Sequence, residues 1–298
     1  MEIRQVSRSF ITPQGRVMAL SEVSADLPTQ GVVGLLGPNG SGKTTLLRII
    51  IGILPPDTGE IWFRGKLLDE TMRRQFGYMP EERGLYPKMT AREQLLYLLR
   101  LKGFSMGEAK KEVAYWAERL DMPWIDRLAR TLSKGMQQKV QLILALAGEP
   151  SVMLLDEPFS GLDPVVSHEI ELLLREKVQR GALIILSTHR LEQVDHLCDF
   201  VLLIHRGQLV LSGETASLRR RFWQRTYEVE IDRPIEGIKL PSGVSFHFTG
   251  VNSARLSVPT SITSTDILQA LLSQAEIKLF AEKLPTIREI FLNIVGEV

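Results

Sequence analysis

The feature that most constrains this chain is a glycine-rich turn between a short apolar run and an apolar helical pattern. The run covers residues 32–36, the turn reads Gly-Pro-Asn-Gly-Ser-Gly-Lys-Thr over 37–44, and the helical pattern continues over 46–50. Glycines let the backbone curl, so that its N–H groups and the helix N-terminus face an anion. We expect a P-loop whose phosphate-binding residues are Asn39, Gly40, Ser41, Gly42, Lys43, Thr44 and Thr45.

Two side chains at the end of this loop carry its chemistry. Lys43 is placed to reach the β- and γ-phosphates of a nucleotide, and the hydroxyl of Thr44 is placed to ligate Mg²⁺. The structural alternative is a strand-to-helix turn that binds nothing. The complete motif in its strand–loop–helix context disfavours that alternative, and we expect a nucleotide and Mg²⁺ as ligands.

An apolar run that ends in two carboxylates narrows the class of nucleotide-binding protein. Residues 152–155 are apolar, and Asp156 and Glu157 follow them. Asp156 suits the Mg²⁺ shell, and Glu157 can orient a water for attack on the γ-phosphorus. The structural alternative is a solvated strand end. Because no Asn-Lys-x-Asp stretch for guanine recognition occurs in the sequence, we expect ATP as the substrate and its hydrolysis as the reaction.

Strand-like and helical patterns alternate along the chain, which favours an α/β domain on a largely parallel sheet. Buried strands are predicted at 32–36, 152–155, 183–186 and 200–204. Between residues 82 and 135 amphipathic helices replace this pattern, and Thr90 with Glu93 and Ser105 with Glu108 have capping-box spacing. A helical subdomain is therefore predicted within the sheet domain.

The character of the sequence changes again near residue 219. Alternating apolar residues predict strands around 227–231 and 244–248, and helical patterns follow at 265–274 and 287–294. A chain of 298 residues is longer than most single domains. We therefore predict a nucleotide-binding domain at 1–218 and a small α+β accessory domain at 219–298.

Composition limits the partners and the compartment. The chain has 36 Lys and Arg against 35 Asp and Glu, so its charge does not favour nucleic acid, and we expect none as a partner. The single cysteine, Cys198, cannot form an intramolecular disulfide. No apolar run approaches the about 20 residues that span a bilayer. The cytosol is the expected compartment, and any membrane crossing would belong to another chain.

A short motif upstream of the two carboxylates makes the prediction more specific. Residues 132–139 read Leu-Ser-Lys-Gly-Met-Gln-Gln-Lys and resemble the signature motif of ATP-binding-cassette (ABC) proteins. The resemblance implies that this loop covers the γ-phosphate held by the P-loop of another subunit, through Ser133 and Gly135. Lys134 and Met136 depart from the Gly and Gln most common there. The structural alternative is an ordinary helix start, which the order of the flanking motifs disfavours.

Other positions match ABC landmarks in chain order. Asp163 ends a Pro-Phe-Ser-Gly-Leu-Asp stretch similar to the loop that links the two active sites, and Asp163 with Pro164 also predicts a helix start. His189 matches the switch histidine that contacts the γ-phosphate. Phe10 matches the aromatic that stacks on adenine, with Val17 on the same face. The structural alternatives are a structural histidine and a core phenylalanine.

Glu81 stands where ABC proteins usually have a glutamine. The resemblance implies that Glu81 ligates Mg²⁺ and senses the γ-phosphate, with added negative charge beside Asp156 and Glu157. Residues 80–87 and 284–291 resemble a bacterial exporter branch of sodium- and drug-export ATPases. The implied fold is a P-loop NTPase cassette with a parallel-rich sheet core, an antiparallel edge sheet and an inserted helical subdomain.

Two functions remain open. The resemblance implies the ATP-hydrolysing subunit of an ABC transporter, peripheral at the cytoplasmic face of the inner (plasma) membrane. Its partners would be a second copy of itself or a homologous cassette and an integral membrane permease, met by Leu85 and Tyr86 in the segment 82–89. The alternative is a soluble ABC-type ATPase that acts on DNA or ribosomes. Such proteins usually fuse two cassettes or insert long coiled coils, and this chain has one cassette and no sustained heptads, so we expect transport, with export.

Overall fold

The computed structural model of the chain describes residues 1–13, 15–82 and 84–296. It divides into two units, Met1–Glu214 and Thr215–Val298. The boundary expected after residue 218 falls within helix α8 (Thr215–Arg221), which belongs to the second unit. Among the described residues, no helix combines the length and the apolar character that crossing a bilayer requires.

A six-stranded sheet in the order β10-β9-β3-β8-β7-β6 forms the centre of the first unit. Its strands are β3 (Gly31–Leu36), β6 (Phe76–Met79), β7 (Val152–Asp156), β8 (Leu183–Thr188), β9 (Phe200–His205) and β10 (Gln208–Glu214). Five of them run parallel, and β10 is antiparallel to β9. The apolar runs predicted as strands are β3, β7, β8 and β9, which confirms the α/β prediction. They are continuous rather than alternating because both faces of this sheet are buried.

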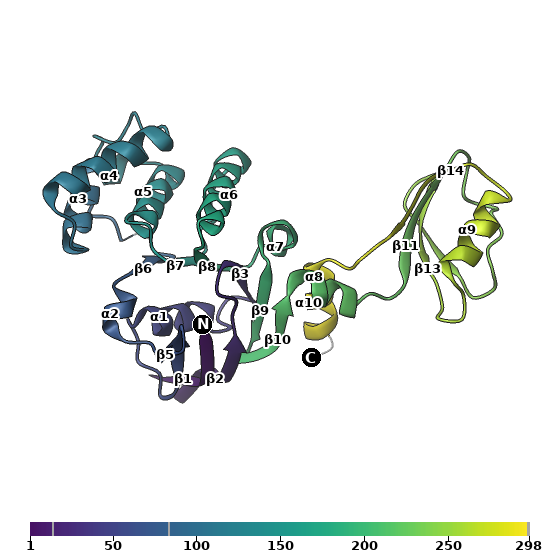
Figure 1. Ribbon diagram of the computed structural model, residues 1–298, viewed down its shortest axis with the longest axis horizontal. Coiled ribbons are helices and arrows are strands. Elements are labelled where there is room, and N and C mark those ends of the chain that lie inside the picture. Colours follow the sequence, from purple (N-terminus) through teal and green to yellow (C-terminus); the bar gives the residue numbers. More distant parts are fainter. Residues whose placement is uncertain (14, 83, 297–298) are drawn as a thin grey trace. The chain divides into compact units, whose positions relative to one another are not determined.

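A second, antiparallel sheet in the order β2-β1-β4-β5 packs on one side of the first. Its strands are β1 (Glu2–Thr12), β2 (Gly15–Asp26), β4 (Thr58–Phe63) and β5 (Lys66–Leu67), and the short helix α2 (Glu70–Arg73) follows. Helix α1 (Lys43–Ile51) and this sheet lie on one side of the six-stranded sheet, opposite α5 and α6 (Figure 1). Side chains of α1 and of both sheets share one buried core.

Helices fill the connection between β6 and β7. They are α3 (Ala91–Leu101), α4 (Met106–Arg119), the 3₁₀ helix η1 (Ala129–Thr131) and α5 (Lys134–Leu146). Capping boxes at Thr90 with Glu93 and at Ser105 with Glu108 begin α3 and α4, as their spacing predicts. Two further helices, α6 (Pro164–Gln179) and α7 (Leu191–Leu197), follow β7 and β8.

The second unit combines a small antiparallel sheet with helices. Its elements after α8 are β11 (Thr226–Ile231), β12 (Ser245–Phe248), β13 (Ser253–Ser257), α9 (Ser264–Leu272), β14 (Ile277–Glu282) and α10 (Ile287–Val295), with the strand order β12-β13-β11-β14. The alternation in Tyr227, Val229 and Ile231 marks the buried face of β11, which packs against Ile267 and Leu271 of α9. The predicted α+β character is therefore confirmed.

Candidate active site

The turn between β3 and α1 borders a cavity of about 350 Å³. Its lining residues are Ala19, Asn39, Gly40, Gly42, Lys43, Thr44, Thr45, Glu81, Asp156 and Glu157. Gly37 and Gly42 both have a left-handed backbone, with φ of 147° and 114°. A Cβ on Gly37 would lie 2.1 Å from the carbonyl oxygen of Ile204, and one on Gly42 would lie 2.4 Å from that of Ala19. Only glycine fits these two positions of the turn. The N-cap residue of α1 is Gly42, which makes no side-chain capping bond, so the N–H groups of the first turn can bind an anion.

Lys43 is the cation of this site. Its Nζ donates to the carbonyl oxygens of Gly37 at 2.8 Å and Pro38 at 3.1 Å. Burial lowers the pKa of the Lys43 ammonium from its ordinary value, against the opposite influence of the Glu157, Asp156 and Glu81 carboxylates. The loop thus fixes a buried positive charge beside its own curled backbone, where the phosphates of a nucleotide would bring the negative charge that it can pair with.

The two carboxylates that end β7 are joined by a serine of the neighbouring strand. The Ser187 hydroxyl donates to Asp156 Oδ1 at 2.5 Å and accepts from the Glu157 N–H at 2.8 Å. This contact follows from the sheet register, in which Asp156 of β7 lies beside Ser187 of β8. No sequence motif points to Ser187, although it stands two residues before His189 at the end of an apolar strand.

The site suits Mg²⁺. Asp156 is buried, and its Oδ2 has no hydrogen-bond partner among the described residues, so this oxygen is available to a cation. Thr44 and Glu81 line the same cavity. No three His, Cys, Asp or Glu side chains gather to hold a metal in the part of the chain that the structure describes. Two carboxylates, one hydroxyl and phosphate oxygens are a ligand set that Mg²⁺ accepts.

Glu157 and His189 form a pair at the cavity. His189 Nδ1 lies 2.9 Å from Glu157 Oε1, and the His189 side chain is 49% exposed whereas that of Glu157 is 9% exposed. Glu157 has a φ of 52°, in the left-handed region of the backbone, directly after the end of β7. A buried carboxylate with a histidine at hydrogen-bond distance can orient a water molecule for attack.

The predicted signature residues Ser133 and Gly135 lie outside the cavity lining, and so does Asp163. Ser133 begins α5 as its N-cap and accepts from the Met136 N–H at 3.3 Å. Ser133 is exposed and Gly135 is partly exposed. Asp163 is exposed too, and it caps α6 with Pro164 in the first turn, which confirms its predicted capping role. The signature residues are therefore at least partly exposed and do not line the cavity of the chain's own phosphate loop.

Phe10 and Val17 face each other on the hairpin of β1 and β2. Neither lines the cavity, although Ala19 of the same β2 strand does. The Arg8 guanidinium lies over the Phe10 ring, 5.3 Å from its centroid, and forms an ion pair with Asp57 at 2.9 Å. The two predicted adenine contacts thus share one face, as expected, and their roles stay predictions.

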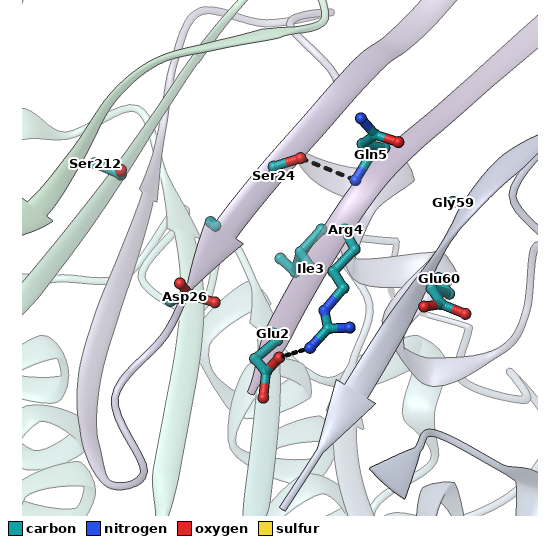
Figure 2. A pocket seen from close by; sticks show the side chains of 10 residues that line it. Glu2, Ile3, Arg4, Gln5, Ser24, Asp26, Gly59, Glu60 and Ser212 are labelled. Carbon is teal, nitrogen blue, oxygen red and sulfur yellow. Dashed lines mark hydrogen bonds and ion pairs between the residues drawn. The ribbon is translucent and has the colours of Figure 1, made fainter. Parts of the chain in front are cut away.

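A larger cavity of about 970 Å³ lies elsewhere, on the antiparallel sheet. Figure 2 shows its acidic side chains Glu2, Asp26 and Glu60 around Arg4, which pairs with Glu2. It shares no lining residue with the P-loop cavity. Volume alone would therefore favour a different cavity from the one at which the curled backbone, Lys43 and the Asp156 oxygen without a partner among the described residues lie.

Comparisons with known proteins give family matches along most of the chain. A family model described as ABC transporter matches residues 20–160, and one described as ATP-binding protein DrrA1-3-like, C-terminal domain, matches residues 213–295. YhaQ of Bacillus subtilis (strain 168), an uncharacterized ABC transporter ATP-binding protein, is 35% identical over 302 residues, which cover 100% of this chain and 99% of YhaQ.

Two further comparisons extend the match. YbhF of Escherichia coli (strain K12), a probable multidrug ABC transporter ATP-binding protein, is 36% identical over 280 residues, covering 89% of this chain and 47% of YbhF. The dimeric, post-hydrolysis structure of the ATP-binding cassette MJ0796 bound to ADP and Pi has a TM-score of 0.65 at 23% identity, covering 72% of this chain and 97% of that chain, and it is similar in fold. The chain belongs to the ATP-binding proteins of ABC transporters, whose cassettes are ATPases.

Proposed function

We propose that the chain hydrolyses ATP as a nucleotide-driven dimer and couples dimer closure to export through a separate integral membrane subunit. The observation that carries this proposal is the separation of its two phosphate-binding motifs. Lys43, Asp156 and Glu157 meet at one cavity, whereas Ser133 is exposed and Gly135 partly exposed at the start of α5. One chain holds the parts of a complete site without bringing them together.

In the proposed reaction the chain positions water and phosphate. Lys43 holds the β- and γ-phosphates, and Glu157 orients the water that attacks the γ-phosphorus, with His189 bound to Glu157. Mg²⁺, held by Thr44 and Asp156 with Glu81 nearby, would neutralise the charge that develops on the phosphate oxygens. Ser187 fixes Asp156 and Glu157 relative to each other, because one hydroxyl bonds to both residues.

The second cassette completes the site in this proposal. An uncovered helix N-terminus with a serine hydroxyl and a glycine N–H is a suitable contact for the γ-phosphate bound by the partner. A two-fold dimer would use each signature loop once, so both sites would be completed together. The MJ0796 cassette, similar in fold, is dimeric in its ADP- and Pi-bound structure. A second copy of this chain or a homologous cassette would serve as the partner.

The membrane partner would meet the segment that follows Glu81, at the cytoplasmic face of the membrane. Tyr86 is 48% exposed, and its ring packs edge-on against Tyr97 of α3, with 6.0 Å between the ring centroids. Leu85 is partly exposed, and Arg83 of this segment lies outside the described residues. YbhF is named as a probable multidrug ABC transporter ATP-binding protein, which supports export as the direction.

Cross-linking in native membranes tests the transporter assignment. Cys198 is replaced by serine, and one cysteine is introduced at Tyr86 or Lys88, with Lys66→Cys on β5 as the matched exposed control. We expect Tyr86→Cys and Lys88→Cys to give adducts with an integral membrane protein whose yield changes with ATP, and the control to give none. Capture of only soluble or ribosomal proteins at both positions would favour the soluble ABC-type ATPase.

A further inference from the structure

Two buried glutamines hold the backbone that follows Glu81. Gln141 of α5 donates from its Nε2 to the Glu82 carbonyl oxygen at 3.1 Å. Gln94 of α3 accepts at its Oε1 from the Tyr86 N–H at 2.8 Å. Gln94 is completely buried and Gln141 is 5% exposed. The two amides thus bind the backbone at Glu82 and at Tyr86, which are the two ends of the segment that follows Glu81.

The other half of each amide has no hydrogen-bond partner in the part of the chain that the structure describes. Gln94 Nε2 and Gln141 Oε1 are buried, and neither bonds to any of the residues described. Buried polar groups are normally satisfied, and an unsatisfied one destabilises the fold. A glutamine that served only the core would be replaceable by an apolar side chain of similar size. Among the described residues, the bond that each glutamine makes to the loop backbone is the interaction that an apolar residue could not supply.

The same helix also holds the backbone next to Glu157. Gln138 donates from its Nε2 to the Pro158 carbonyl oxygen at 2.9 Å and to that of Glu157 at 3.4 Å. Gln138 and Gln141 are three residues apart, so they lie on one face of α5. Ser133, the N-cap of this helix, is the predicted contact for the partner's γ-phosphate. Helix α5 therefore contacts the backbone next to Glu81 as well as the backbone next to Glu157.

We propose that Gln141, with Gln94, is a positioning residue that sets where Glu81 stands in the phosphate site. The proposal rests on the function proposed above for Glu81. Any displacement of α5 on engagement of Ser133 would be transmitted through Gln141 to Glu82 and through Gln138 to Glu157. One helix would then position both Glu157, which orients the water, and Glu81, which lies near the metal.

Replacement of Gln141 by leucine tests this assignment. Gln141→Leu gives an apolar side chain of similar size, which removes the bond to Glu82 together with the buried oxygen that has no partner among the described residues. These two effects on stability oppose each other, so we expect the melting temperature to change little. We expect kcat for ATP to drop by roughly 10- to 100-fold, as for a misplaced catalytic group, with KM nearly unchanged. Gln94→Leu should behave alike. Gln274→Leu, which removes glutamine-to-backbone bonds within the second unit, is the matched control and should leave kcat unchanged.

A double-mutant cycle with Glu81→Ala distinguishes the positioning role of Gln141 from the proposed role of Glu81 in ATP hydrolysis. If Gln141 acts through Glu81, the effects of Gln141→Leu and Glu81→Ala on kcat are not additive. Additive effects, or a fall in kcat that merely follows a fall in melting temperature, would overturn the positioning role alone. Unchanged turnover in Glu81→Ala would remove Glu81 from the reaction, and the inference would fall with it.

Discussion

Glu157 has a left-handed backbone that a glutamate adopts at a cost of about 1–3 kcal/mol, with a φ of 52°. The bonds around it hold this conformation. Its N–H is bound by Ser187, and its carbonyl oxygen lies 3.4 Å from Gln138 Nε2. Strain that the surroundings maintain at a buried carboxylate indicates a residue placed for chemistry.

The first prediction concerns Glu157→Gln. The amide keeps the shape and the hydrogen-bonding reach of the side chain but is a far weaker base, so turnover should fall by about 100-fold or more. ATP affinity should remain, because Lys43 and the loop backbone are untouched. ATPase assays with size-exclusion chromatography in Mg-ATP are the measurement, and we expect a trapped dimer. Turnover close to wild type would exclude Glu157 as the base.

The second prediction concerns the buried thiol of Cys198 and the stability of the fold at alkaline pH. Burial first, with Asp199 and Asp195, raises the pKa of its thiol well above the ordinary value. The unfolded chain loses this proton near about pH 8.5 and the folded chain keeps it. The group therefore stabilises the fold below that pH and progressively less above it.

Cys198→Ala should remove this pH dependence. We expect the unfolding free energy of the wild type, relative to Cys198→Ala, to fall above about pH 8.5 by up to about 1.4 kcal/mol per pH unit. Urea unfolding of both chains between about pH 7.5 and pH 10 gives the difference, in which other titrating groups cancel. Parallel curves for the two chains would contradict the expectation.

Helix α5 packs directly on β6, and a glycine makes this possible. A Cβ on Gly77 would lie 1.9 Å from the carbonyl oxygen of Ala145. This obstacle is backbone, so it cannot rotate away as a side chain could. The close approach brings the face that carries Gln138 and Gln141 against the strands that end at the cavity.

Gly77→Ala should therefore push α5 away from the sheet. We expect a loss of roughly 1–3 kcal/mol in stability from overpacking, or more because the contact is with backbone. Gly107→Ala in α4 is the control, since nothing lies within 4 Å of its Cβ position, and alanine should stabilise the helix by up to about 1 kcal/mol. Denaturant unfolding followed by circular dichroism measures both. Equal stability of the two variants would show that α5 can shift without strain.

Completion of each site by a second chain is a property of the assembled molecule, and mixed dimers test it. Ser133→Arg should prevent completion of the site that its loop covers, and Lys43→Ala should remove the phosphate contact, so each chain alone should be inactive. In a heterodimer one site combines the intact Lys43 of one chain with the intact Ser133 of the other. Random mixing should restore roughly a quarter of wild-type turnover if the sites are independent. Proven heterodimers without restored activity would indicate that the signature loop acts within its own chain.

Local motifs determined much of this protein from the sequence. The P-loop, the Asp156–Glu157 pair and the capping boxes depend on residues close together in the chain, where spacing fixes geometry. The strands were predictable because parallel strands covered on both faces are continuously apolar. The family resemblance, confirmed by the comparisons, follows from the same short motifs and their order.

Tertiary structure decided what joins these motifs. Ser187 meets Asp156 through the register of two neighbouring strands, and Gln94 and Gln141 meet one loop from two different helices. Hydrophobic periodicity would place a glutamine on the solvent side of a helix, so these buried amides had no signal in the sequence. Bonds between residues distant in the chain depend on strand register and helix packing. Those two features are set only when the whole core forms.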